Sequence, residues 1–244
     1  MTQKKPLHAL QHLLNVAGHV VDQGSGYLVV FDVNEKSASR ATPHGINFEL
    51  SLLSPRGTRL LVFKNAARGH SIPNEHLNVR RFDYNPSNRK TQRIATHCSY
   101  HSADILLKDF FAATDRVLLM RKHTLSVQDR QGQETMRQQL LQLAAHSSEL
   151  DKPGIWFPSD SALHSVLTEN ASHLLQTIRD RQPASISELS ILAGQNYERV
   201  RRTLSILNRY RFVALFCERN GLQPVDNSGW MQTNVASAQN KKPT

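Results

Sequence analysis

The sequence lacks the features that mark secreted, disulfide-stabilised or membrane proteins. It has only two cysteines in 244 residues, Cys98 and Cys217, and they fall in different predicted domains without metal-ligand spacing. No apolar run approaches the roughly 20 residues of a membrane span. Polar residues interrupt the basic start of the chain, which therefore does not read as a signal peptide. We expect a protein of a reducing, bacterial cytoplasm with no membrane contact, no metal and no cofactor.

Acidic residues are also in the minority. The chain has 30 Lys and Arg against 20 Asp and Glu, which gives a formal net charge of +10. A charge of this size favours a polyanionic partner, and nucleic acid is the natural candidate. Hydrophobic residues make up 39% of the sequence, which is enough for one or two packed domains.

The first half of the chain predicts an α+β domain. After a short amphipathic helix near the start, the pattern changes to period two. Three strands are expected at residues 27–33, 46–53 and 58–63. The last two are joined by a turn at residues 54–57, because Pro55 presets the second turn position and Gly57 accepts the backbone of the fourth. Residues 65–96 show no sustained periodicity.

Two helices are expected after this sheet. Ser102 opens a long helix that has apolar residues on one face and is expected to cover one face of a small antiparallel sheet. A glutamine-rich segment at residues 128–148 predicts a second, amphipathic helix within a linker. Two placements remain open for it, because it could pair with a second copy of the chain or pack on its own domain.

The pattern of residues 168–225 predicts three helices and a hairpin. Thr168 opens the first helix, and Ser185 with Glu188 forms a capping box for a short second helix. A turn around Gly194 leads to a third helix capped by Asn196. Two apolar runs then flank an Asn-Gly pair, which is the strongest short signal for a two-stranded hairpin. This order is typical of a winged helix-turn-helix.

The third helix has one apolar and one basic face. Val200, Leu204 and Leu207 fall on one side, and Arg202 lies opposite them. An exposed helix of this kind fits the major groove of double-stranded DNA, where Arg can bind a guanine edge or a phosphate. We expect ten residues to contact DNA: Gln195, Asn196, Tyr197, Glu198, Arg199, Arg201, Arg202, Ser205, Arg209 and Arg219.

Residues 185–207, followed by Phe212 and Val213, resemble the winged-helix antitoxins of the TumA type. The matching positions are Glu188, Leu189, Gly194, Tyr197, Val200 and Arg202. Asn196 stands where that family more often has Asp, a change that a helix cap tolerates. The resemblance implies a protein that binds its own promoter and neutralises a cognate toxin.

The region of residues 19–119 is similar to TumE-type toxins, most of all at residues 100–118. The family motif after the third strand usually reads Phe-Asp-Asn-Ala-His, whereas this chain has Lys64 in place of the acid and Ala67 in place of the histidine. These replacements favour a toxin-like domain without catalysis, so no catalytic residue is assigned. An alternative stays open, in which an active RNA-cleaving toxin is held in check by its fused antitoxin. It rests on the remaining histidines His70, His76, His97 and His101.

The expected organisation has four parts. These are a toxin-like α+β domain (1–122), a linker with one amphipathic helix (123–154), a winged helix-turn-helix domain (155–226) and a disordered tail (227–244). The expected function is that of a sequence-specific DNA-binding regulator of the toxin–antitoxin type. DNA is the expected partner, with a cognate toxin or RNA as further candidates, and a homodimer is expected because such proteins commonly read two half-sites.

Overall fold

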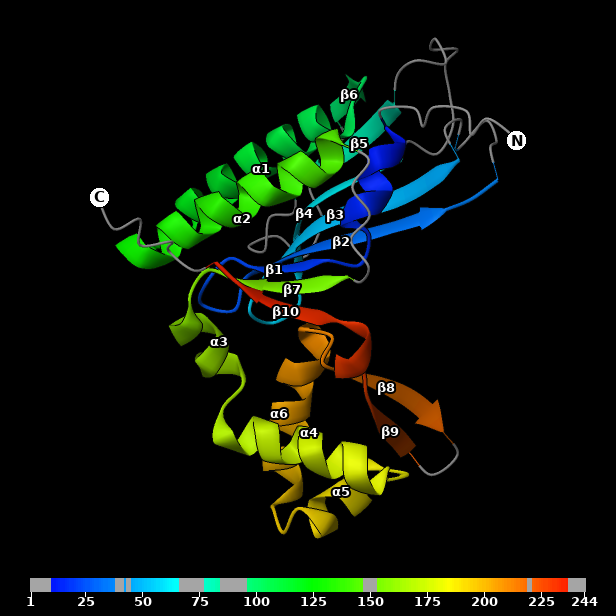
Figure 1. Ribbon diagram of the computed structural model, residues 1–244, viewed down its shortest axis with the longest axis vertical. Coiled ribbons are helices and arrows are strands. Elements are labelled where there is room, and N and C mark those ends of the chain that lie inside the picture. The colour runs from blue at the N-terminus through cyan, green and yellow to red at the C-terminus, as the bar shows by residue number, and fades with distance from the viewer. Residues whose placement is uncertain are drawn as a thin grey trace, which may run out of the picture.

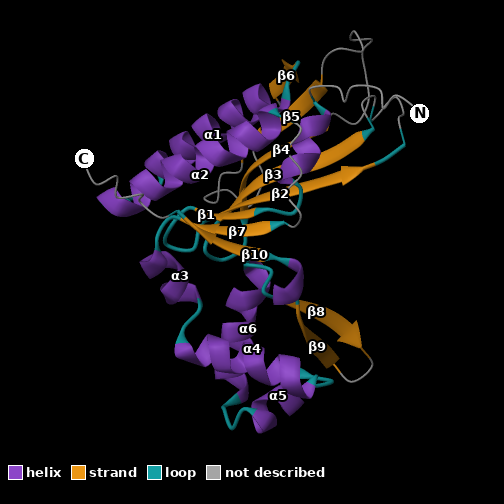
Figure 2. Ribbon diagram, viewed as in Figure 1, coloured by secondary structure: helices purple, strands orange, loops and turns teal. Residues whose placement is uncertain are grey.

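The computed structural model describes residues 10–37, 42, 45–65, 77–83, 96–146, 153–218 and 221–236. It contains one large sheet, a separate two-stranded hairpin, and helices on both sides of the large sheet (Figures 1 and 2). The predicted α+β class is confirmed. The sheet differs from the small antiparallel one expected from the sequence, because the described residues form eight strands in the order β10-β7-β1-β2-β3-β4-β5-β6.

Six of these strands follow one another along the first half of the chain. The sheet strands are β1 (Val20–Asp22), β2 (Leu28–Glu35), β3 (Ile46–Leu53), β4 (Arg59–Asn65), β5 (Leu77–Asp83), β6 (Thr96–Tyr100), β7 (Gly154–Phe157) and β10 (Gln232–Val235). From β1 to β6 each strand pairs antiparallel with the next, whereas β7 lies parallel to both β1 and β10. The three predicted strands are confirmed as β2, β3 and β4. Strands β5 and β6 arise in or next to the stretch without periodicity.

One face of the sheet is covered by η1 (Gln11–Val16), α1 (Ala103–Met120) and α2 (Val127–Ala145). The predicted helix at Ser102 is confirmed as α1. Its Phe110 contacts Phe31 of β2 and Phe63 of β4 edge-on, with ring centroids 6.3 and 5.3 Å apart. All three rings are fully buried, and edge-to-face contacts add to the free energy of burial.

Helix α2 is confirmed, but it does not act as a linker. Its Met136, Leu140 and Ala144 are buried in the same core as α1 and the sheet. Its Arg137 pairs with Asp115 of α1. Of the two placements left open by the sequence, the structure therefore shows packing on the same chain. Five of the six glutamines of α2 are exposed and one, Gln133, is buried, which is why the segment looked like a polar linker.

The other face of the sheet meets a second group of elements. These are α3 (Asp160–Val166), α4 (Glu169–Arg181), α5 (Ile186–Leu192), α6 (Tyr197–Arg209), β8 (Val213–Glu218) and β9 (Gly221–Asp226). We call them the helical unit. The three helices and the hairpin predicted for residues 168–225 are all present. Thr168, Ser185 and Asn196 accept backbone hydrogen bonds at the starts of α4, α5 and α6, as their cap positions predict.

The end of the chain is more ordered than expected. A short 3₁₀ turn, η2 (Ser228–Trp230), leads into β10, which pairs with β7 in the register Gln232 to Gly154. The prediction of a disordered tail is therefore wrong for residues 227–236, and residues 237–244 lie outside the described part. A four-residue strand leaves too short an alternating pattern to be recognised in a polar segment.

Strand β7 belongs to both cores of the protein. Its Trp156 packs into the core with α1 and α2, whereas Ile155 and Phe157 pack into the core of the helical unit. The same alternation occurs in β1, where Val21 faces the first core and Val20 the second. This follows from the period-two geometry of a strand. The two halves therefore share one sheet, and no boundary of the expected kind separates them.

A substitution at Gly132 tests how closely α2 packs on the sheet that both cores share. A Cβ atom at Gly132 would lie 1.8 Å from the carbonyl oxygen of Pro158, which follows β7. Gly132→Ala should therefore lower the free energy of unfolding by about 1–3 kcal/mol, although alanine normally favours a helix. Gly229→Ala is the control, because a Cβ there meets no atom within 4 Å. Equal urea-unfolding midpoints for the two variants would contradict this packing.

Candidate nucleic-acid interface

Helix α6 lies with its C-terminal end against the sheet and its N-terminal end, together with α5, at the far end of the molecule (Figure 1). Its buried face is formed by Val200, Leu204 and Leu207, which are fully buried. The opposite face contributes nothing to that core. The far end of α6 is thus held by apolar packing on one side and open to a partner on the other.

The first half of α6 carries a group of exposed residues: Tyr197, Glu198, Arg199, Arg201, Arg202 and Ser205. Ile206 and Asn208 are the exposed residues of its second half. Asn196 caps this end, its Oδ1 accepting a hydrogen bond of 2.8 Å from the Glu198 amide. Arg201 and Glu198 form an ion pair of 3.2 Å, and both side chains are more than half exposed. Such a pair is weak in water, so both groups are available to a ligand.

The turn before α6 adds polar and apolar groups to the same end. Gly194 has a φ of +61°, a backbone conformation that a glycine adopts without strain. The Gln195 side-chain oxygen is buried without a hydrogen-bond partner in the described residues. Ile191 of α5 is 79% exposed and Tyr197 43%. Exposed apolar groups beside arginines suit a DNA base edge, where thymine presents a methyl group.

Arg209 was expected to contact DNA, but the structure places it elsewhere. Its guanidinium donates hydrogen bonds to the carbonyl oxygens of Gly26 and Pro55, both at 2.5 Å, and more weakly to Ser54 at 3.4 Å. These acceptors lie in the two turns at one end of the sheet. The helical pattern correctly places Arg209 on the side of α6 opposite the buried apolar residues. It could not show that the sheet covers this end of the helix. The tenth candidate, Arg219, lies outside the described residues.

The junction next to Arg209 contains residues that the sequence analysis did not single out. Tyr210 stacks on Phe157 of β7 with ring centroids 5.6 Å apart, and its hydroxyl lies 3.4 Å from Asp22 of β1. Arg211 donates to the Gly18 carbonyl at 3.3 Å and pairs with Asp32 of β2. Three consecutive residues after the exposed part of α6 therefore fasten it to the sheet. The sequence gives little signal for this, because the hydrogen-bond partners are more than 150 residues away.

Asp22 is the least expected charge in this junction, since only 3% of it is exposed. Burial, and to a lesser extent the nearby Asp129 carboxylate, raise its pKa to about 6. Hydrogen bonds from the Gly24 amide and Tyr210, together with the Arg209 charge, oppose the shift. A buried carboxylate with a raised pKa is more common at functional sites than in ordinary cores.

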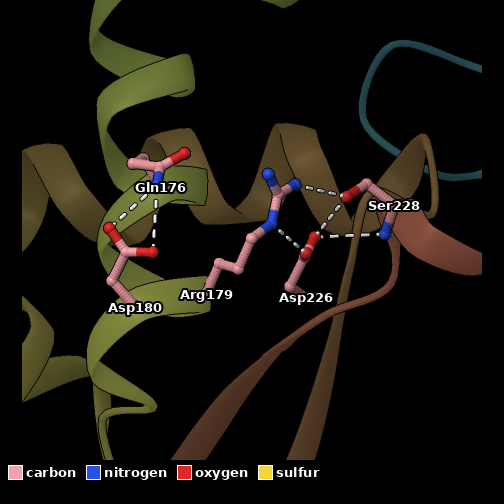
Figure 3. Close-up of polar contacts among 5 residues, drawn as sticks. All are labelled: Gln176, Arg179, Asp180, Asp226 and Ser228. Atoms are coloured by element: carbon pink, nitrogen blue, oxygen red, sulfur yellow. Dashed lines mark hydrogen bonds and ion pairs between the residues drawn. The ribbon is translucent and has the colours of Figure 1, made fainter.

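The hairpin is fixed to the helices at its base (Figure 3). Arg179 of α4 pairs with Asp226 of β9 at 3.0 Å and donates to the Ser228 hydroxyl at 2.8 Å. Partial burial would raise the pKa of Asp226, but hydrogen bonds from Ser228 and the Arg179 charge lower it overall. The hairpin is thereby held beside α4 and projects from the same unit as α6.

The toxin-like motif of the sequence forms no site in the described residues. Phe63 is buried, and the Lys64 ammonium lies over the Phe82 ring, 5.1 Å from its centroid. The Asn65 carboxamide bonds to the backbone of β3, accepting from Phe48 and donating to Ile46. Ala66, Ala67, His70, His76 and the His97 side chain lie outside the described part. Among the described residues, no group of three or more His, Cys, Asp or Glu could hold a metal ion.

Comparison with known proteins matches only the helical unit. A family model with the description HVO_A0114 matches residues 166–225, from the end of α3 to the second strand of the hairpin. No curated protein and no solved structure matches the chain. In the part of the chain that the structure describes, no helix is long and apolar enough to cross a membrane.

Asp22 gives the junction a pH dependence with a defined sign. Its folded pKa of about 6 lies above the ordinary 3.8, so its contribution to stability is fully present below about pH 4 and is lost as the pH rises through 6. Asp22→Asn stays neutral and should remove this loss, on the order of 3 kcal/mol at most. Urea unfolding at pH 4.5 and 7.5 measures it. Asp180→Asn, at an exposed carboxylate, is the control, and an unchanged pH dependence in Asp22→Asn would contradict the assignment.

Proposed function

We propose that this protein is a sequence-specific DNA-binding regulator. In this proposal residues 168–226 form a winged helix-turn-helix, with α6 as the recognition helix and the β8–β9 hairpin as the wing. The observation that carries it is the division of α6: its first turns present exposed polar and basic side chains, and its last turn is fastened to the sheet. The order of three capped helices and a hairpin also supports the proposal.

The direction of α6 suits entry into a major groove. In helix-turn-helix proteins the N-terminal residues of the recognition helix contact the base edges. Here that end carries Glu198, Arg201 and Arg202 and lies farthest from the sheet. The sheet therefore stays clear of the duplex. Arg202 is the best candidate for a bidentate contact to guanine, because it is exposed and no acidic residue of the described chain pairs with it.

The first half of the chain serves as a support in this proposal. From the resemblance of residues 185–207 to TumA-type antitoxins and of residues 19–119 to TumE-type toxins, we propose a toxin–antitoxin regulator that binds its own promoter. Lys64 and Asn65 are engaged with Phe82 and with the β3 backbone, which argues against RNA cleavage at this motif. We further propose a homodimer, since two copies would read two half-sites one DNA turn apart.

Selection from a pool of random DNA duplexes tests the proposal with the full chain. We expect a short preferred sequence to be enriched, and binding to it should weaken steeply with salt because the chain carries a net charge of +10. Weak binding of all duplexes alike, with no enriched sequence, would contradict a sequence-specific role.

Arg202→Ala tests whether this side chain contacts a base of the selected sequence. Loss of one base contact should weaken specific binding by about 1–3 kcal/mol and relax the preference at one position. Arg116→Ala removes the same charge from α1, on the opposite face of the sheet, and should leave the preference unchanged. Arg209→Ala should lower the free energy of unfolding instead. If Arg202→Ala binds with unchanged affinity and preference, this residue does not read the sequence.

A further inference from the structure

A cavity of about 400 Å³ lies where the helical unit meets the sheet. Four parts of the chain surround it: the loop after β1, the first turn of α2, helix α3 and the last turn of α6. Pockets at such junctions are the usual place for small ligands. Neither the sequence motifs nor the proposed DNA contact uses this cavity.

Two carboxylates line the cavity. Asp22 comes from β1, and Asp129 comes from the start of α2. Only 3% of Asp22 is exposed. Its Oδ1 accepts hydrogen bonds from the Gly24 amide at 3.0 Å and from the Tyr210 hydroxyl at 3.4 Å. Its Oδ2 forms no hydrogen bond with any described residue. Asp129 is oriented by the hydroxyls of Ser126 and Ser159, at 2.7 and 2.5 Å.

One described cation, Arg209, acts on this pair: its charge opposes the raised pKa of Asp22, but it forms no ion pair with either carboxylate. Arg209 also lines the cavity, but its two terminal nitrogens are directed at the carbonyl oxygens of Gly26, Ser54 and Pro55. Among the described residues, neither Asp22 nor Asp129 takes part in an ion pair. Burial, and to a lesser extent the nearby Asp129 carboxylate, raise the pKa of Asp22 to about 6, so the Asp22 carboxylate is largely ionised at neutral pH. Such a pair is unfavourable unless a cation joins it.

The rest of the lining is apolar and small. Ala162 and Val166 of α3 and Ile206 of α6 form one wall, and Ser161 and Ser165 add hydroxyls. Ile206 is 43% exposed, so part of this wall is open in the described structure. A ligand that fits would carry a positive charge at one end and a short apolar body at the other.

We propose that this cavity binds a small organic cation, a primary amine whose ammonium group lies between Asp22 and Asp129 and whose apolar body contacts Val166 and Ile206. Charge-assisted hydrogen bonds to two carboxylates are strong in a partly dry site. The chain as a whole is strongly positive, so its surface disfavours other cation sites. Binding of a cation at this cavity is therefore distinct from nonspecific attraction of cations to the protein surface.

A ligand here would also reach α6. Ile206, Arg209 and Tyr210 line the cavity, and they belong to or directly follow the end of α6 that the sheet holds. A ligand that binds one arrangement of this end better than another would shift its population. Any resulting effect on DNA rests on the proposed function, whereas binding of the amine does not.

Titration calorimetry on the full chain tests the proposal by measuring the affinity of three small molecules that are similar in shape and differ in charge. Phenethylamine is the cation, 2-phenylethanol the neutral analogue and phenylacetate the anion. At pH 7.5 we expect phenethylamine to bind at least tenfold more tightly than 2-phenylethanol, with no binding of phenylacetate. Equal binding of amine and alcohol, or no binding of the amine, would overturn the proposal.

Variants locate the site. Asp22→Asn and Asp129→Asn should each weaken phenethylamine binding at least tenfold, whereas Asp180→Asn, which removes the same charge from α4, should bind as the natural chain does. Ser165→Leu fills the cavity from an exposed position of α3 and should abolish binding even if Asp22→Asn fails to fold. Unchanged binding in folded Ser165→Leu would place the amine elsewhere and overturn the proposal.

Discussion

Strand β7 inserts between β1 and β10 and carries the packing of both halves of the protein. Its Trp156 enters the core with α1 and α2, while Ile155 and Phe157 enter the core of the helical unit. Because neighbouring residues of a strand point to opposite faces, the two cores cannot be separated without breaking this strand from its partners. The helical unit is therefore fixed in one orientation relative to the sheet.

This fixed orientation explains how α6 can have a held end and an open end. Arg209, Tyr210 and Arg211 bind the turns and strands of the sheet, and the apolar face of α6 packs within the helical unit. The first turns then project away from both. In the proposed function, the sheet thus acts as a rigid support that presents Arg202 to DNA. The acidic cavity at the same junction gives a small ligand a way to reach this support.

Local signals in the sequence predict the helical unit well. Thr168, Ser185 and Asn196 each cap the helix that their position indicates, and the spacing of Val200, Leu204 and Leu207 identifies the buried face of α6. Features that depend on distant partners were missed or misplaced. Strands β7 and β10 are too short to show a period, and the amphipathic pattern of α2 did not show whether its apolar face packs on the same chain or on a second copy. Nothing local shows that a turn of the sheet covers Arg209.

In the proposed function, the open end of α6 binds DNA while its other end stays on the sheet. Hydrogen exchange of the full chain, with and without a duplex obtained by selection, tests it most directly. We predict slower exchange for residues 193–205 on DNA binding, with residues 206–213 protected to the same degree in both states. Slower exchange confined to the sheet, with residues 193–205 unchanged, would contradict it.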